Sequence, residues 1–310
     1  MCHLSGIILG RKMRRVAERE MLVSILRDVL VASGPLGPHA TGAGWVKRSG
    51  EFAIYKDAVT AEKLVSMPEF DELVSSVDNT TTVLLGHARY RTRGDERNNA
   101  NNHPLVANSV VGTVRGTLLN ADELFPKFRL KRTAQVDSEL LVRLAAVTGR
   151  LGPIDTRRFL AGVRYCRGQI SGILVSLQDP ETILVLKGDT PLEFRYHKTA
   201  RAVAYASKGS ILDSVLVGAD GWRVLEVPAM SLAVFRTDAI QDVELLPLEY
   251  HVQRPRSQGN QRVDPGDCDT ATPPWHWSNV PGSTQTGPAP DHSTRTTNRQ
   301  ERQNPRGNTQ

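Results

Sequence analysis

A cysteine stands directly behind the first methionine of the chain, and a mainly apolar run from Leu4 to Leu9 follows it. A run of this length that ends at a glycine, here Gly10, predicts a short buried strand. Removal of Met1 would leave Cys2 with both a thiol and a free α-amine. Because an unperturbed α-amine has a pKa near ~7.7–8.0, it can accept the proton of the thiol at neutral pH. The stretch is therefore open to two interpretations, a terminal nucleophile that carries its own base or an ordinary buried cysteine, and alone it favours the second.

The length of 310 residues allows one large domain or two ordinary ones. The three cysteines lack CxxC or comparable spacing, so the sequence indicates neither a disulfide framework nor a zinc ribbon and predicts a reducing, cytoplasmic setting. No window has the pattern of a signal peptide, and the most apolar stretch, residues 21–32, is interrupted by Arg27 and Asp28, so no membrane association is expected. The formal net charge of +6 is not gathered into a basic cluster with interleaved aromatic residues, so no direct contact with nucleic acid is expected.

Hydrophobic periodicity predicts helices and strands along most of the chain. Apolar residues at helical spacing between Met21 and Leu30 predict a helix that ends at Gly34. A buried strand is predicted over 81–85, and another over 106–114. Further helices are predicted over 60–67, 137–146, 154–163 and 210–216, and further strands over 44–47, 52–55, 170–177, 182–186, 192–196, 202–206, 222–227 and 231–236.

The composition changes near residue 250. Beyond it the chain consists mostly of Pro, Gly, Ser, Thr, Asn, Gln and Arg, and such a segment cannot bury enough apolar surface to offset the entropy lost on ordering. We therefore predict one domain over residues 1–250 and a disordered tail over 251–310. Trp275 and Trp277 stand out within this tail, and the sequence leaves open whether they belong to a loose segment or to a short docking motif.

Four short pieces of sequence follow one another in order. They are Cys2; Gly86–Gly94 (GHARYRTRG) with Asn101–Pro104 (NNHP) behind it; Val114–Gly116 (VRG) leading to Asn120–Leu124 (NADEL); and Val136–Glu139 (VDSE), which opens a helix. In this order they resemble the glutaminase domain of class II glutamine amidotransferases, which are N-terminal nucleophile hydrolases. The resemblance covers about residues 2–235 and implies an α+β fold, a four-layer αββα sandwich in which helices cover two antiparallel sheets packed face to face.

The resemblance implies a role for each matched residue. Cys2 would attack the side-chain amide of glutamine, which releases ammonia and leaves a glutamyl thioester for water to cleave. Arg89 would hold the α-carboxylate of glutamine with both prongs of its guanidinium, with Thr92 nearby. Asp137 would bind the α-ammonium, and Gly116 would donate its backbone N–H to the oxyanion. Outside this family, Arg89 would be an ordinary solvated arginine and Asp137 a helix N-cap.

Two positions depart from the family pattern. Arg115 replaces the asparagine that donates to the oxyanion, and Arg93 follows Thr92 where histidine or aspartate is frequent. Because the arginine side chain is longer than that of asparagine, we expect Arg115 to swing out of the site and to leave Gly116 as the main donor. Arg115 still counts among the candidate catalytic residues, since a guanidinium can donate to an oxyanion.

The predicted function is glutamine hydrolysis with delivery of ammonia to a separate synthetase or transferase. No cofactor is expected, and His87 and His103 are predicted to be structural residues and not metal ligands. Two alternatives stay open. One is a stand-alone amidase or γ-glutamyl hydrolase, in which Arg93 and Arg115 accommodate a more anionic substrate. The other is a catalytically inactive binding partner that keeps the fold.

Overall fold

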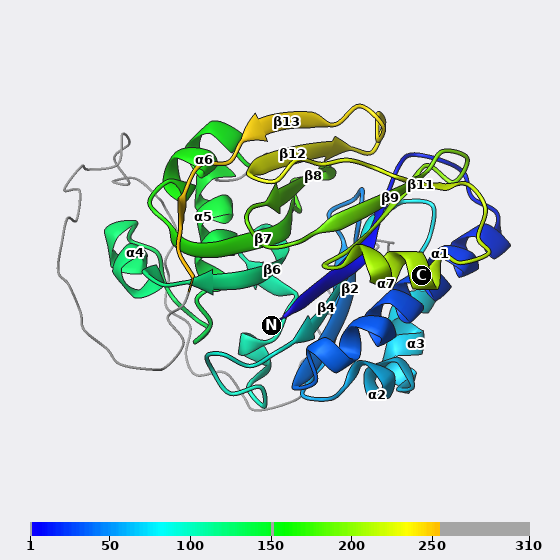
Figure 1. The fold of residues 1–310 in the computed structure, drawn as a ribbon, viewed down its shortest axis with the longest axis horizontal. Helices are drawn as coiled ribbons and strands as arrows, with labels where there is room; N and C mark the ends of the chain where they lie inside the picture. Colours follow the sequence, from blue (N-terminus) through cyan, green and yellow to red (C-terminus); the bar gives the residue numbers. More distant parts are fainter. Residues whose placement is uncertain (1, 150–151, 255–310) are drawn as a thin grey trace, which may run out of the picture.

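The computed structural model describes residues 2–149 and 152–254, which form two packed β-sheets with helices on both outer faces (Figure 1). The first sheet has the strand order β11-β9-β10-β1-β4-β2-β3. The second has the order β13-β12-β8-β7-β6-β5, and β14 pairs in parallel with the start of β7. The strands are β1 (His3–Leu9), β2 (Ala40–Lys47), β3 (Phe52–Asp57), β4 (Thr81–Arg89), β5 (Leu105–Ala107), β6 (Val110–Leu118), β7 (Arg167–Ser176), β8 (Asp179–Lys187), β9 (Glu193–His197), β10 (Ala202–Ala206), β11 (Trp222–Val224), β12 (Ser231–Arg236), β13 (Glu244–Pro247) and β14 (His251–Val252).

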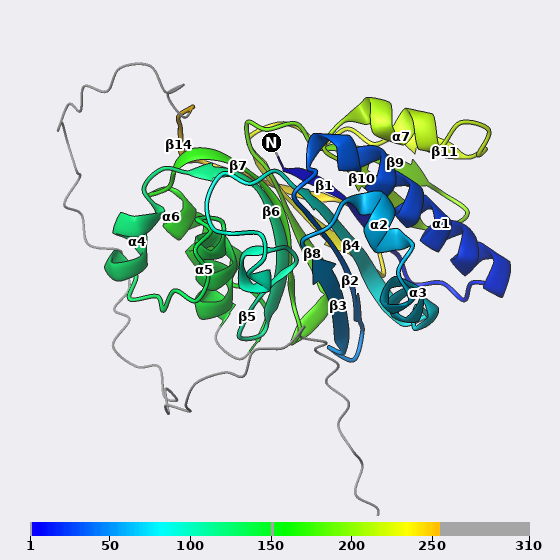
Figure 2. The same ribbon diagram turned by 90° about the horizontal axis from the view of Figure 1, so that it is seen from below.

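The helices form the two outer layers (Figure 2). Helices α1, α2, α3 and α7 pack on the first sheet, and α5 packs on the second with α4 and α6 beside it. This arrangement confirms the predicted four-layer αββα sandwich. The helices are α1 (Val16–Ser33), α2 (Ala61–Val65), α3 (Pro68–Ser75), α4 (Ala121–Lys127), α5 (Glu139–Gly149), α6 (Thr156–Val163) and α7 (Gly209–Val215), with short 3-10 turns η1 (Gly34–Leu36) and η2 (Asn99–Asn101).

Apolar side chains on both faces of β1 hold this strand in the middle of its sheet. Leu4 and Ile8 point into the layer between the two sheets, where they join residues of β7 and β8. Ile7 and Leu9 belong to the cluster under α1. Because successive side chains of a strand point to opposite faces, a strand covered on both faces needs a nearly continuous apolar run. The sequence after Cys2 has such a run, so Cys2 is attached directly to a firmly packed strand.

The sequence predicts a single strand over 106–114, and this prediction is wrong. The structure has the hairpin β5–β6 here, and its turn contains Asn108 with a φ of 50°. Asparagine tolerates this left-handed conformation better than most residues. The apolar pattern continues on both sides of the turn without a glycine or proline, which is why the turn gives no signal.

Two strands of the second sheet, β13 and β14, are also absent from the sequence prediction. Strand β13 extends the sheet beyond β12, and β14 places His251 and Val252, which the sequence assigns to the tail, beside β7. The rest of the predicted tail, including Trp275 and Trp277, lies outside the described residues. Across the described ranges, none of the helices combines the length and the apolar character needed to cross a bilayer.

Candidate active site

Cys2 is the residue directly before β1. At this end of the sheet, β1 pairs with β4 through His3 and Ala88. The Cys2 side chain is half-buried, and its Sγ lies 3.3 Å from the backbone oxygen of Tyr90, to which the thiol donates. Burial raises the pKa of the Cys2 thiol, although the contact with Tyr90 and the positive charge of Arg89 act in the opposite direction. A thiol in these surroundings stays protonated at neutral pH and needs a base before it can attack.

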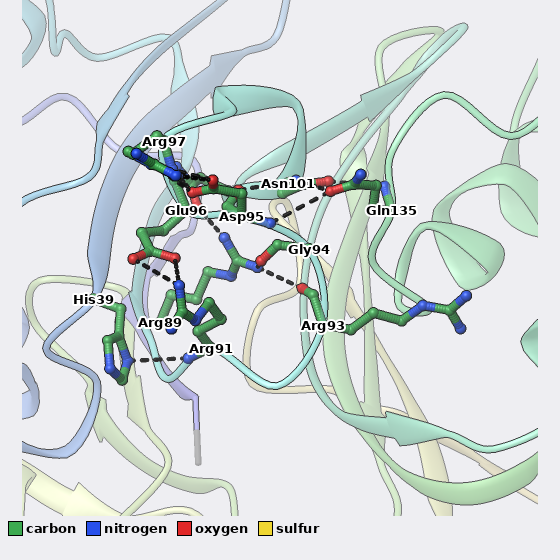
Figure 3. Close-up of polar contacts among 11 residues, drawn as sticks. His39, Arg89, Arg91, Arg93, Gly94, Asp95, Glu96, Arg97, Asn101 and Gln135 are labelled. Carbon is green, nitrogen blue, oxygen red and sulfur yellow. Dashed lines mark hydrogen bonds and ion pairs between the residues drawn. The ribbon is translucent and has the colours of Figure 1, made fainter.

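Arg89 ends β4, and its buried guanidinium fixes the loop that follows (Figure 3). Its Nη1 donates to Oδ1 of Asn102 at 2.6 Å, and its Nη2 donates to the backbone oxygens of Arg93 and Gly94 at 2.6 and 2.8 Å. Each planar fork of a guanidinium includes an N–H of Nη2. Both of these N–H groups are donated to the loop, so the two-pronged contact predicted for Arg89 requires the carboxylate of a substrate to replace a loop carbonyl.

Asparagine side chains tie the same loop to the segment before α5. Nδ2 of Asn101 donates to the backbone oxygen of Asp95 at 2.9 Å and to Oε1 of Gln135 at 3.0 Å. The backbone N–H of Gln135 returns a bond to Oδ1 of Asn101 at 2.8 Å. Gly94 has a φ of +75°, and a Cβ there would lie 2.9 Å from the Asn101 side chain. The motifs include Gly94 and Asn101 but give no indication that these residues brace the loop (Figure 3).

Gly116 lies on β6 opposite Ile170 of β7. Its φ is +129°, and a Cβ would lie 1.9 Å from the backbone oxygen of Gln169. No side chain fits this position, so the strand pairing itself requires glycine. The requirement exists whether or not the N–H of Gly116 serves an oxyanion.

We expect from the sequence that Arg115 swings out of the site, but in the structure its side chain is buried. It is 3% exposed, and its Nη1 donates to the backbone oxygen of Pro191 at 2.9 Å. Burial lowers the pKa of Arg115, while negative charge on Cys2 and on Asp189 would raise it. The buried guanidinium is therefore held by the turn between β8 and β9.

Asp137 lies close to the same end of β6. Its carboxylate is 6% exposed and accepts the backbone N–H of Leu118, the last residue of β6. Burial raises the pKa of Asp137, and the N–H groups of Leu118 and Ser138 lower it. Negative charge on Asp137 acts to raise the pKa of Cys2. Thr92, the remaining predicted residue, is exposed on the loop behind Arg89.

Three buried histidines lie beside this site. The rings of His87 and His103 stack with centroids 4.3 Å apart, and Nε2 of His103 lies 3.2 Å from Oγ of Ser138. Burial lowers the pKa of His87 and of His3 to about 3 each, so both rings are neutral at physiological pH. Within residues 2–149 and 152–254, no three His, Cys, Asp or Glu side chains are grouped in a way that could hold a metal ion.

Sequence comparison finds curated relatives among enzymes that are longer than this chain. They are the isomerizing glutamine–fructose-6-phosphate aminotransferases of two Staphylococcus epidermidis strains. Each is 24% identical to this chain over 205 residues, which make up 65% of this chain and 32% of the relative. The chain thus spans about a third of the length of these relatives. No family model matches the sequence.

Solved structures with a similar fold include an amidotransferase. Glutamine phosphoribosylpyrophosphate amidotransferase from B. subtilis, complexed with ADP and GMP, superimposes with a TM-score of 0.60 and 17% identity, and the match covers 80% of this chain and 49% of that one. A structure described as the allosteric regulatory enzyme of purine biosynthesis gives a TM-score of 0.61 and 16% identity over the same shares. These matches confirm the fold that the sequence motifs predict.

Proposed function

We propose that this chain, a homologue of the glutaminase domain of class II glutamine amidotransferases, hydrolyses glutamine through Cys2 and supplies the ammonia to a separate acceptor enzyme. One observation carries the proposal. Cys2 and Arg89 stand at the same end of the paired strands β1 and β4 of the first sheet, Arg115 and Gly116 lie next to each other on β6 of the second, and Asp137 accepts the backbone N–H of Leu118 at the end of β6.

The chemistry starts with removal of Met1, which turns the α-nitrogen of Cys2 into a basic amine. This amine takes the proton of the buried thiol, and the thiolate adds to the side-chain carbonyl carbon of glutamine. The N–H of Gly116 and the cation of Arg115 stabilise the negative oxygen that forms. The protonated amine then gives its proton to the leaving nitrogen, ammonia departs, and water activated by the same amine cleaves the thioester to release glutamate.

The other end of glutamine requires one anionic and one cationic partner. Asp137 supplies the anion, because two backbone N–H groups favour its charged form even though burial raises its pKa. The α-carboxylate lies at the Arg89 loop, where it takes the place of a backbone oxygen on Nη2 and contacts Thr92. Binding of glutamine is therefore coupled to a rearrangement of residues 92–94.

The acceptor of the ammonia is proposed to lie on another protein. Residues 2–254 form the αββα sandwich, and the match to the aminotransferases covers about a third of their length. A synthetase or transferase that docks near Cys2 would supply the missing site.

An ammonia-release assay with purified protein tests the proposal. Intact mass should show that Met1 is absent, and wild-type protein should release ammonia and glutamate from glutamine in equal amounts. Cys2→Ala and a form with an extra residue before Cys2 serve as controls, and both should be inactive because one lacks the thiol and the other lacks the free amine. Equal activity in either control would exclude the mechanism. An acceptor-dependent rise in turnover with a co-purifying protein would identify the partner.

A further inference from the structure

A cavity of about 870 Å³ opens on the outer side of the Arg89 loop. Two segments line it, residues 91–95 of the loop and residues 132–135 before α5. Its lining contains neither Cys2 nor Asp137, and it shares with the proposed glutamine site the loop residues 92–94. We call it the arginine cavity, because Arg91, Arg93 and Arg132 belong to its lining.

Positive charge exceeds negative charge around the arginine cavity. Arg93 and Arg132 both pair with one carboxylate, that of Asp122, at 3.0 and 2.5 Å. Arg91 pairs with Glu96 at 2.9 Å. The guanidinium of Arg89 behind the loop donates to an amide oxygen and two backbone oxygens, which carry no net charge. Asp95, the carboxylate in the lining, pairs with Arg97 at 2.6 Å. The site therefore keeps an excess of about two positive charges, one at the Asp122 pairs and one at Arg89, and favours a ligand with two or more negative charges.

Both walls of the cavity are braced from behind. The loop wall is held by Arg89 through the backbone oxygens of Arg93 and Gly94. The opposite wall is held by the buried carboxylate of Glu139, which accepts the backbone N–H groups of Thr133 and Ala134 at 2.7 to 3.1 Å. A site whose walls are already fixed loses little conformational entropy when a ligand binds.

Arg93 has donors left for a ligand. One of its terminal nitrogens donates to Asp122, and its side chain is 45% exposed. Asp122 is 59% exposed, and ion pairs between exposed groups contribute little to stability, so an incoming anion can compete for the arginine. A guanidinium fork matches the geometry of carboxylate and phosphate groups.

We propose that the arginine cavity binds a small polyanion that carries carboxylate or phosphate groups. Arg93 makes the principal contact, and Asp122 acts as a built-in competitor that occupies the arginines when the ligand is absent. The site stands next to the proposed glutamine site and shares its loop, but binding there does not depend on glutamine hydrolysis. Of the residues in its lining, the family resemblance assigns only Thr92 to a ligand.

Calorimetric titration of the full chain tests the proposal with two probes, citrate for carboxylates and inorganic phosphate for phosphate. Saturable binding of at least one probe is expected, and the tighter probe identifies the chemical group. Arg93→Gln should weaken binding at least tenfold. Asp122→Asn should strengthen it several-fold because it removes the competitor, an effect that a merely structural role of Asp122 would not produce. Arg158→Ala is the matched control, since Arg158 is also about half exposed and paired with an aspartate but lies on α6.

Three results would overturn the proposal. They are failure of both probes to bind, equal losses in Arg93→Gln and Arg158→Ala, or weaker binding in Asp122→Asn. Circular dichroism of each variant excludes misfolding as the cause of a loss. The titration requires no turnover, so its failure leaves the glutaminase proposal intact. Conversely, a protein that binds citrate but does not hydrolyse glutamine would support the arginine cavity and contradict the glutaminase proposal.

Discussion

The two sheets contribute to the candidate active site in different ways. The first sheet holds Cys2 through apolar packing, with Leu4 and Ile8 on one face of β1 and Ile7 on the other. The second sheet presents Arg115 and Gly116 on a strand that a glycine and a series of polar contacts hold in place. Apolar packing is tolerant of side-chain identity, whereas hydrogen bonds and a missing Cβ are not. The nucleophile is therefore robustly placed, and the proposed oxyanion site is sensitive to single changes.

The polar contacts on the second sheet converge on the turn between β8 and β9. Asp189 accepts the backbone N–H of Ile170 at 3.2 Å, Nε2 of Gln169 at 2.8 Å and the hydroxyl of Tyr250 at 2.6 Å. Two residues on, the backbone oxygen of Pro191 accepts Nη1 of Arg115. Tyr250, just before β14, thus contacts the turn that holds Arg115.

The largest expected effect tests whether Cys2 serves as the nucleophile or as a packing residue of the first sheet. Cys2→Ala should lower ammonia release from glutamine by at least about 10³-fold. The thermal midpoint should stay within about 1 °C, because Cys2 lies outside the apolar clusters that hold β1. Calorimetry and the ammonia assay measure the two quantities. A large fall in the midpoint would show that the thiol is a packing group, as the simplest interpretation of the sequence suggests.

On the second sheet, a single substitution should lower stability as well as activity. Gly116→Ala adds a Cβ 1.9 Å from the backbone oxygen of Gln169, and its φ of +129° is strained for alanine. Strain of this kind costs about 1–3 kcal/mol, and the clash adds to it. Gly218→Ala is the control, because Gly218 also has a positive φ, +76°, but nothing lies within 4 Å of its added Cβ. Urea unfolding should show the larger loss for Gly116→Ala, and equal losses would mean that β6 shifts to accept the methyl group.

Arg115 comes next. Arg115→Ala removes a buried cation near Cys2 and should lower kcat about 10²–10³-fold with little change in KM. Arg115→Asn should lower kcat similarly, because the shorter amide leaves the backbone oxygen of Pro191 without its donor. Arg14→Ala is the control, since Arg14 is also buried and donates to backbone oxygens, but at Gly10 and Ala200. A rise in ammonia release in Arg115→Asn would favour the swung-out arrangement expected from the sequence.

The sequence predicts the first sheet better than the second for a physical reason. Hydrophobic period is a local signal, so it identifies β1, α1 and the first, apolar part of β4. The turn at Asn108 lies between two apolar runs and carries no such signal. The motifs also predict site residues that lie at the ends of strands and helices, because the spacing within each motif fixes their positions.

The supports of the site could not be predicted in the same way. Tyr250 and Asp189 are 61 residues apart, and a hydrogen bond between side chains leaves no periodic trace in the sequence. The same holds for Glu139 behind the wall of the arginine cavity, which the sequence shows only as part of a motif. The orientation of Arg115 depends on Pro191, 76 residues away, so length of side chain alone gave the wrong expectation.

The smallest expected effect tests whether Tyr250 acts through Arg115. Burial and the nearby carboxylate of Asp189 raise the pKa of Tyr250, so its hydroxyl stays protonated and donates to Asp189. Tyr250→Phe keeps the ring and removes this bond and the one that the hydroxyl accepts from the backbone N–H of Asp189 at 2.9 Å, while the Asp189 carboxylate retains Ile170 and Gln169 as donors. The turn should loosen slightly, so kcat should fall about three- to tenfold, and KM should stay unchanged because Asp137 and the Arg89 loop are untouched.

A double-mutant cycle makes this last prediction specific. If Tyr250 works only by placing Arg115, then Tyr250→Phe should have no further effect on kcat in an Arg115→Ala background, because residues that act through one another are not additive. Tyr196→Phe provides the control for loss of a hydroxyl, since Tyr196 is a partly buried tyrosine on β9 that packs in the inter-sheet cluster. It should leave kcat unchanged in both backgrounds. An equal fall in kcat for Tyr250→Phe with and without Arg115 would show that the C-terminal strand influences the site by another route, and that the polar contacts around Asp189 stabilise the sheet without positioning the arginine.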